Sequence, residues 1–67
     1  MTISFNGKDM EFPSPISLAQ LLADLGLFDQ PGVAVAQNQQ LIRRADWVST
    51  IVHDGDELEV LHATAGG

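Results

Sequence analysis

The chain has no cysteine among its 67 residues, and this absence limits the ways in which it can be stabilised. A domain of this size buries only about 60% of the surface of its unfolded chain and often needs a disulfide or a metal. Disulfides are excluded, and His53 and His62 are too few for a closed zinc site without carboxylate ligands. We therefore expect a single domain that is stabilised by packing and binds no metal.

The charge of the chain excludes several classes of partner. Nine acidic side chains against three basic ones give a formal charge of −6. Such a chain lacks the positive surface that binds phosphate backbones and anionic membranes, so we expect neither nucleic acid nor membrane as a partner. No apolar run approaches the about 20 residues that span a bilayer, and the first residues lack a secretory signal pattern. We expect a cytoplasmic protein that is a monomer when free.

The first twelve residues predict a β-hairpin. Apolar and polar residues alternate over residues 2–6, and the alternation resumes over residues 10–12. Asn6-Gly7 lies between these segments and suits the central positions of a type I′ turn. That turn sets Ile3 opposite Met10.

A helix of two to three turns is predicted after the two prolines that close the hairpin. Ser17 and Gln20 have the spacing of a capping box. An apolar stripe follows at helical spacing: Leu18, Leu21, Leu22 and Leu25. Gly26 is suited to the left-handed residue that ends a helix, with Leu27 folding back on Leu22.

The second half of the chain predicts short strands, turns and one irregular connection. The expected strands are residues 33–36, covered on both faces, residues 41–42 and residues 57–62. In the connection before the last strand we expect one helical turn, with Trp47 and Ile51 sharing a face that packs on the core.

This order of elements favours an α+β fold of the β-grasp, or ubiquitin-like, type. We expect a mixed sheet of four to five strands that curls over one main helix. Residues 1–62 form the domain in this prediction, and residues 63–67 form a flexible C-terminal tail.

The tail has the sequence Ala63-Thr64-Ala65-Gly66-Gly67. A frayed terminus is the simplest interpretation. Because glycine has no Cβ, however, such a tail could also enter a narrow channel and present its carboxylate there. A carboxylate becomes an acyl donor once it is joined to AMP as a mixed anhydride. The chain has neither a cysteine nucleophile nor a glycine-rich phosphate loop, so another protein would have to activate it.

Four features together resemble the ThiS family of sulfur carriers in thiamin biosynthesis: residues 33–38, Arg44 followed by Trp47, residues 54–57, and the terminal Gly66-Gly67. The resemblance implies a protein cosubstrate that is not an enzyme and binds no cofactor. It implies that a ThiF-type enzyme uses ATP to adenylate the carboxylate of Gly67. A persulfide donor then converts this group to a thiocarboxylate, which a ThiG-type thiazole synthase consumes. Many relatives have proline where this chain has Arg43.

The tail and the last strand contain the residues that could meet these partners. Ala65, Gly66 and Gly67 would enter the partner's channel. In the last strand Leu61 is out of phase with the inward residues and is either scattered surface hydrophobicity or a docking anchor. Glu57, Glu59 and Asp56 cluster beside the tail and are candidates for steering the chain onto a basic partner surface.

Two other functions remain open at this point. One is a sulfur carrier of the related MoaD family, which serves molybdopterin synthesis. Its members tend to have bulkier residues before the glycines, so the small residues of this tail favour the thiazole branch. The other is a non-covalent ubiquitin-like binding module in which Gly66-Gly67 is incidental.

Overall fold

The computed structural model describes residues 1–62. The predicted tail, with Ala65, Gly66 and Gly67, lies outside the described residues, so its boundary with the domain stays a prediction. The elements, in chain order, are β1 (Thr2–Phe5), β2 (Lys8–Glu11), β3 (Ile16–Ser17), α1 (Leu18–Asp24), β4 (Val33–Gln37), β5 (Gln40–Ile42), the 3-10 turn η1 (Arg44–Asp46), β6 (Ile51–Val52) and β7 (Glu57–His62).

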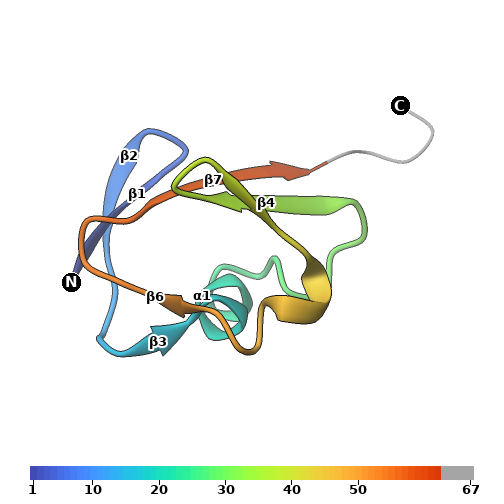
Figure 1. Ribbon diagram of the computed structural model, residues 1–67, viewed down its shortest axis with the longest axis horizontal. Coiled ribbons are helices and arrows are strands. Elements are labelled where there is room, and N and C mark those ends of the chain that lie inside the picture. Colours follow the sequence, from blue (N-terminus) through green and yellow to red (C-terminus); the bar gives the residue numbers. More distant parts are fainter. Residues whose placement is uncertain (63–67) are drawn as a thin grey trace.

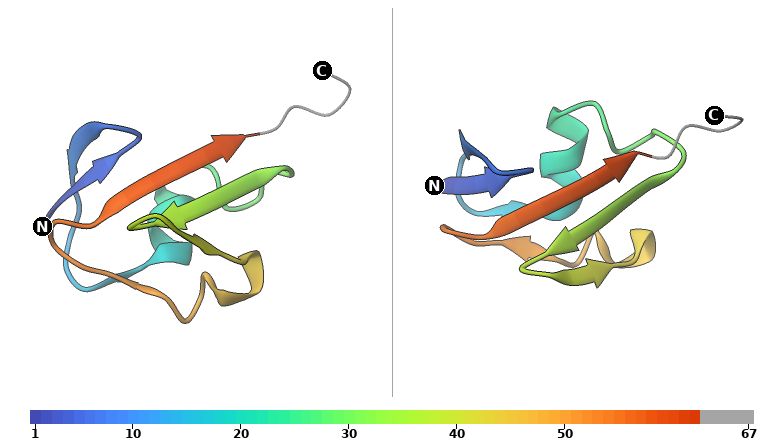
Figure 2. Two further views of the ribbon diagram at one scale, coloured as in Figure 1. Left: turned by 45° about the horizontal axis from the view of Figure 1, so that its top comes forward. Right: turned by 90° about the horizontal axis from the view of Figure 1, so that it is seen from above.

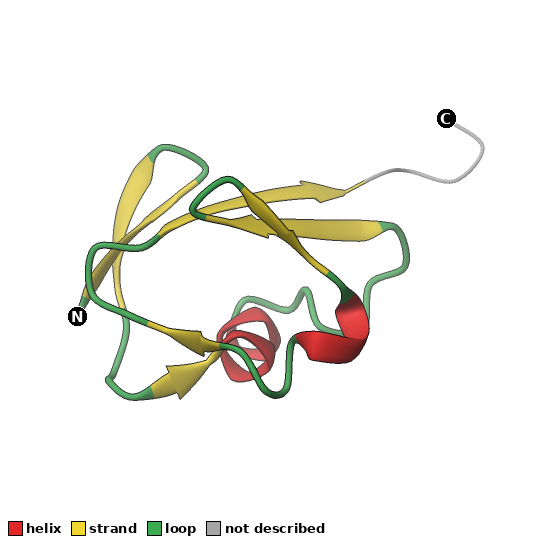
Figure 3. Ribbon diagram, viewed as in Figure 1, coloured by secondary structure: helices red, strands yellow, loops and turns green. Residues whose placement is uncertain are grey.

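Five strands form one mixed sheet that packs over helix α1 (Figures 1 and 3). The strand order is β2-β1-β7-β4-β5, in which β1 and β7 are parallel and the other pairs antiparallel. This confirms the predicted β-grasp fold. A second, two-stranded sheet of β3 and β6 was not predicted, because strands of two residues leave no periodicity to detect.

The N-terminal hairpin has the predicted register. Ile3 lies opposite Met10, and the turn residues Asn6 and Gly7 both have positive φ, at 51° and 82°. Both values suit a type I′ turn, whose twist matches that of the flanking strands. Local sequence therefore determines this part of the sheet.

Helix α1 begins and ends as predicted, with one difference at its start. The Ser17 hydroxyl accepts a hydrogen bond from the Gln20 backbone N–H at 3.0 Å. The Gln20 side chain donates to Asp24 instead of returning to Ser17, so half of the capping box forms. At the other end Gly26 has a φ of 73°, and the Leu27 N–H donates to the Leu22 carbonyl at 2.8 Å. This is the predicted left-handed stop.

The core lies between the sheet and α1 and includes Trp47, which is fully buried and donates to the Ile42 carbonyl at 3.2 Å. The buried apolar residues are Ile3, Ile16, Leu18, Leu21, Leu22, Val35, Trp47, Val52, Leu58 and Val60. The prediction that Ile51 packs on the core beside Trp47 is wrong. Ile51 is 45% exposed, because it alternates with the buried Val52 in β6.

The prediction that residues 33–36 are covered on both faces is also wrong. Val35 is buried, but Ala34 is exposed. The helix covers one face of the sheet, and within residues 1–62 no element covers the other, which we call the outer face (Figure 1). No helix in this range is long and apolar enough to cross a membrane.

Candidate functional site

Strand β7 is the central strand of the sheet and leads into residues 63–67. It runs between β1 and β4 and ends at His62, opposite Val33 (Figure 2). Leu58 and Val60 are buried on the inner face and are the inward residues with which Leu61 was expected to be out of phase. The alternation of a strand places the side chains between them on the outer face.

All three predicted docking residues lie on this outer face. Glu57, Glu59 and Leu61 alternate with the buried residues of β7, and all three are exposed. The structure thus brings them together on the strand that precedes Gly67. Their role in docking stays a prediction.

An apolar patch continues from Leu61 across the outer face. Leu61 is 73% exposed and lies opposite Ala34 of β4. Ala36, two residues on in β4, lies opposite Leu41 of β5, which is 68% exposed. We call these four residues, Ala34, Ala36, Leu41 and Leu61, the outer patch. The sequence did not indicate that Leu41 belongs to this surface, because its place opposite Ala36 depends on the register between β4 and β5. The alternate alanines of β4 were the available sign of an apolar outer surface.

Carboxylates border the outer patch on the side toward β1 and β2. Glu59 lies opposite Ala36, and Glu57 lies opposite Ser4, whose other neighbour is Asp9. Every charged side chain at these outer positions is acidic. The face therefore combines an apolar centre with a negative border, which complements an apolar surface surrounded by basic residues.

Two asparagines in left-handed turns hold β7 from opposite sides. Asn38 donates its N–H to the Glu57 carbonyl at 2.8 Å, and its side-chain oxygen accepts from the Glu57 N–H at 2.9 Å. Asn6 accepts from the Val60 N–H at 2.7 Å and donates to the Val60 carbonyl at 3.2 Å. Both asparagines have a φ of 51°. The strand that leads to the tail is thus fixed near both ends.

Asp56 stabilises the turn that precedes β7 through hydrogen bonds to its carboxylate. Its carboxylate is buried and accepts hydrogen bonds from the His53 N–H, Gln37 Nε2 and Asn38 Nδ2, at 2.8, 2.7 and 3.1 Å. Burial acts to raise the pKa of Asp56, but these three donors and the nearby His53 ring outweigh it, so the pKa lies below its usual value. The prediction that Asp56 steers docking together with Glu57 and Glu59 is wrong, because its carboxylate is buried among these donors.

Arg44 joins the loop after α1 to η1. Its guanidinium donates to the carbonyls of Phe28 and Gln30, both at 2.8 Å, and lies over the Trp47 ring. Arg44 therefore has a structural role. Both Arg44 and the neighbouring Arg43 are exposed.

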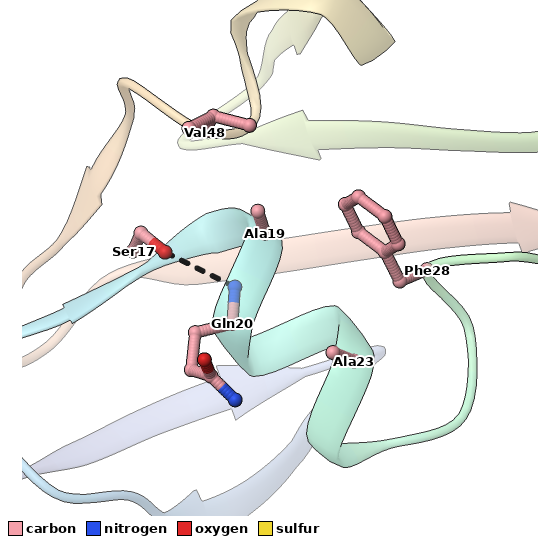
Figure 4. Close-up of a pocket in the computed structure, with 6 residues that line it drawn as sticks. All are labelled: Ser17, Ala19, Gln20, Ala23, Phe28 and Val48. Atoms are coloured by element: carbon pink, nitrogen blue, oxygen red, sulfur yellow. Dashed lines mark hydrogen bonds between the residues drawn. The ribbon is translucent and has the colours of Figure 1, made fainter.

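A shallow hollow of about 290 Å³ lies beside α1, away from the outer face. Its lining residues are Ser17, Ala19, Gln20, Ala23, Phe28 and Val48 (Figure 4). None of these side chains titrates, and the Ser17 hydroxyl already binds the Gln20 N–H. The lining therefore offers no acid, base or nucleophile.

Among residues 1–62, no group of three His, Cys, Asp or Glu side chains is placed to hold a metal ion.

Comparison with known proteins gives consistent matches. The model of the ThiS family matches residues 3–67. The sulfur carrier protein ThiS of Escherichia coli K12 is 37% identical over 67 residues, which cover all of both chains. A thiazole synthase of Paramagnetospirillum magneticum is 31% identical over the same 67 residues, but the chain spans only 20% of its length. A crystal structure of the thiamine biosynthesis protein ThiS from Geobacter metallireducens matches with a TM-score of 0.84 and 29% identity, covering all of both chains.

Proposed function

The chain belongs to the ThiS family, and from this we propose that it is a sulfur carrier for thiamin biosynthesis. Its carboxylate at Gly67 is the group that carries sulfur. The observation that carries the proposal is the similarity to the E. coli sulfur carrier over the whole length of both chains, which extends through Gly66-Gly67. The chain acts as a cosubstrate of partner enzymes and has no bound cofactor.

The proposed chemistry loads sulfur onto the carrier in three steps and then delivers it. A ThiF-type enzyme joins the Gly67 carboxylate to AMP, and ATP releases pyrophosphate. The terminal sulfur of a persulfide then attacks the acyl carbon, AMP leaves, and an acyl disulfide forms. A thiol reductant cleaves the sulfur–sulfur bond, which leaves a thiocarboxylate on Gly67 and a disulfide on the donor side. This thiocarboxylate supplies sulfur to a ThiG-type thiazole synthase.

The thiazole branch is favoured over the molybdopterin branch. The thiazole synthase of P. magneticum contains a segment that matches this whole chain at 31% identity. A carrier segment within a thiazole synthase supports a functional pairing of the two activities. The small residues before Gly66-Gly67 favour the same branch.

Docking uses the outer patch and its acidic border. Leu61 is the apolar anchor, and Glu57 and Glu59 steer the approach to a basic partner surface. Residues 63–67 span at most about 16–18 Å when extended, so the body can remain outside while Ala65, Gly66 and Gly67 enter the partner's active site. In this proposal the partners act in the cytoplasm on a monomeric carrier.

The test is the mass of the protein after reaction with the adenylating enzyme, ATP and a sulfur donor, followed by alkylation with a thiol reagent. A thiocarboxylate at Gly67 is alkylated, whereas oxidation of Met1 or Met10, which changes the mass almost equally, is not. The chain has no cysteine to react in its place. A matched control carries one extra alanine after Gly67.

An alkylated C-terminal fragment in the natural sequence, and none in the extended control, is the expected result. An unmodified Gly67, with an enzyme that is active on another carrier, would contradict the proposal and favour a non-covalent binding module. Modification of the extended control would show that the reaction does not require Gly67 as the terminal residue.

A further inference from the structure

The end of β7 is held on one side by a side chain in place of a strand. β1 pairs with β7 at Ser4 and Phe5 and then turns back at Asn6. β7 itself continues to His62. Beyond β1, the carboxamide of Asn6 makes both of its hydrogen bonds to the backbone of Val60, at 2.7 and 3.2 Å. A carboxamide has the same donor and acceptor as a peptide group, so Asn6 takes the place of a further residue of β1.

We propose that Asn6 is a positioning residue for the reactive tail. By fixing the backbone of Val60, it fixes the direction in which the chain leaves the sheet at His62. It also keeps Leu61 pointing to the outer face. This inference rests on the proposed function, because it concerns the docking of Leu61 together with entry of the tail into a partner.

The physical reason is that β4 alone would otherwise hold the last residues of β7. A strand end with one neighbour opens locally more readily than one held on both sides. In that open state Leu61 no longer has a fixed position relative to the rest of the outer patch, and the direction in which the chain leaves the sheet at His62 is no longer fixed. Binding must then restore this order, and the cost reduces affinity for the partner without changing the chemistry at Gly67.

Asn38 provides a matched comparison. It has the same φ of 51°, and its carboxamide also binds the backbone of β7, but at Glu57 on the opposite side and far along the strand from His62. Asn6→Gly and Asn38→Gly each remove one carboxamide from β7, and Asn38→Gly also removes the hydrogen bond from Asn38 Nδ2 to the Asp56 carboxylate, so the control is the more severe change for stability. Glycine adopts positive φ readily, so both turns can keep their backbone.

The first measurement is hydrogen exchange in the free proteins. The Val60 amide is expected to exchange at least about fivefold faster in Asn6→Gly than in the natural sequence, since it loses its acceptor. In Asn38→Gly the Val60 amide is expected to exchange as in the natural sequence. Unchanged exchange in Asn6→Gly would contradict the role of Asn6 in holding Val60.

The second measurement is the steady-state kinetics of adenylation by the partner enzyme, below the melting temperature of both variants. Asn6→Gly is expected to raise KM about three- to tenfold, as expected for the loss of one hydrogen bond, with kcat within about twofold. Asn38→Gly is expected to leave KM within about twofold. Asn6→Asp, which keeps the acceptor for the Val60 N–H and loses the donor, gives an intermediate KM and serves if Asn6→Gly does not fold.

Two results would overturn the inference while leaving the proposed function intact. One is that the natural sequence is adenylated and that Asn6→Gly is adenylated with the same KM. The other is an equal rise of KM in both glycine variants, which would indicate a general effect of stability. Failure of the natural sequence to be adenylated would contradict the proposed function instead, and the exchange of the Val60 amide would still test the contact.

Discussion

The guanidinium carbon of Arg44 lies 4.5 Å from the centre of the Trp47 ring, while the same group binds the carbonyls of Phe28 and Gln30. A planar guanidinium can stack and donate in two directions at once, but an ammonium cannot reproduce this geometry. Arg44→Lys is therefore expected to lower the free energy of unfolding by about 1 kcal/mol. For a domain of this size the melting temperature falls by about 4–8 °C.

Arg43→Lys is the control for this prediction. Arg43 is exposed, as Arg44 is, but it pairs with the Asp46 carboxylate at 3.3 Å in place of bonds to backbone carbonyls. Exposed ion pairs contribute little, so the melting temperature is expected to change by less than about 3 °C. Similar losses in both variants, measured by thermal denaturation, would contradict a special role for Arg44.

Asp56 gives the stability a defined pH dependence. Its folded-state pKa is lowered, so the ionised carboxylate stabilises the fold above the unfolded-state pKa of about 3.9. This stabilisation is lost as the pH falls through the lower folded-state pKa. Asp56→Asn should lower the free energy of unfolding at pH 7 by about 1.5–3 kcal/mol and flatten its decline below pH 4. Urea denaturation from pH 2.5 to 7 measures this, with the exposed Asp9→Asn as the control.

Leu61 is expected to anchor the adenylating enzyme. Truncation to alanine removes an exposed side chain, so stability should change little, but a buried anchor at an interface contributes about 2 kcal/mol or more. Leu61→Ala should therefore raise KM for adenylation about thirtyfold. Val48→Ala is the matched control, because Val48 is 69% exposed but lies beside the hollow, away from the outer face. Equal effects of the two changes would count against docking through the outer patch.

The acidic border is expected to govern the rate of association. Removing both charges in Glu57→Gln/Glu59→Gln should slow association with the adenylating enzyme about tenfold at low salt and weaken its dependence on ionic strength. Asp24→Asn/Asp29→Asn removes two charges elsewhere and serves as the control. Stopped-flow binding at several salt concentrations distinguishes a local effect from a change in net charge.

The size of Gly66 is expected to matter only in the partner's active site. Gly66→Val adds a branched side chain where the proposed channel requires a bare backbone, and should reduce kcat/KM for adenylation at least about 100-fold. Gly66 lies outside the predicted domain of residues 1–62, so the melting temperature is expected to be unchanged. Ala63→Val, farther from the carboxylate, should have a smaller effect in the same assay.

The sequence predicts the parts of the fold that depend on neighbouring residues. Asn6-Gly7 and Gly26 determine a turn and a helix end because each conformation requires particular residues locally. The β3–β6 pair and the exposure of Ala34 depend on contacts between distant segments, which local periodicity does not report. The same reason applies to the candidate site. Asn6 is identifiable as a turn residue, but its bonds to Val60 join positions 54 apart in the chain.

The parallel arrangement of β1 and β7 has a mechanical consequence. Because the N-terminal strand and the strand leading to the tail run in the same direction, traction applied to the tail pulls β7 along the length of its neighbours (Figure 1). The force is then shared by the hydrogen bonds of β7 to β1, to β4 and to Asn6. These bonds are loaded in shear and do not break one after another. With the proposed function, the carrier would thus resist unfolding from the end that its partner enzymes bind.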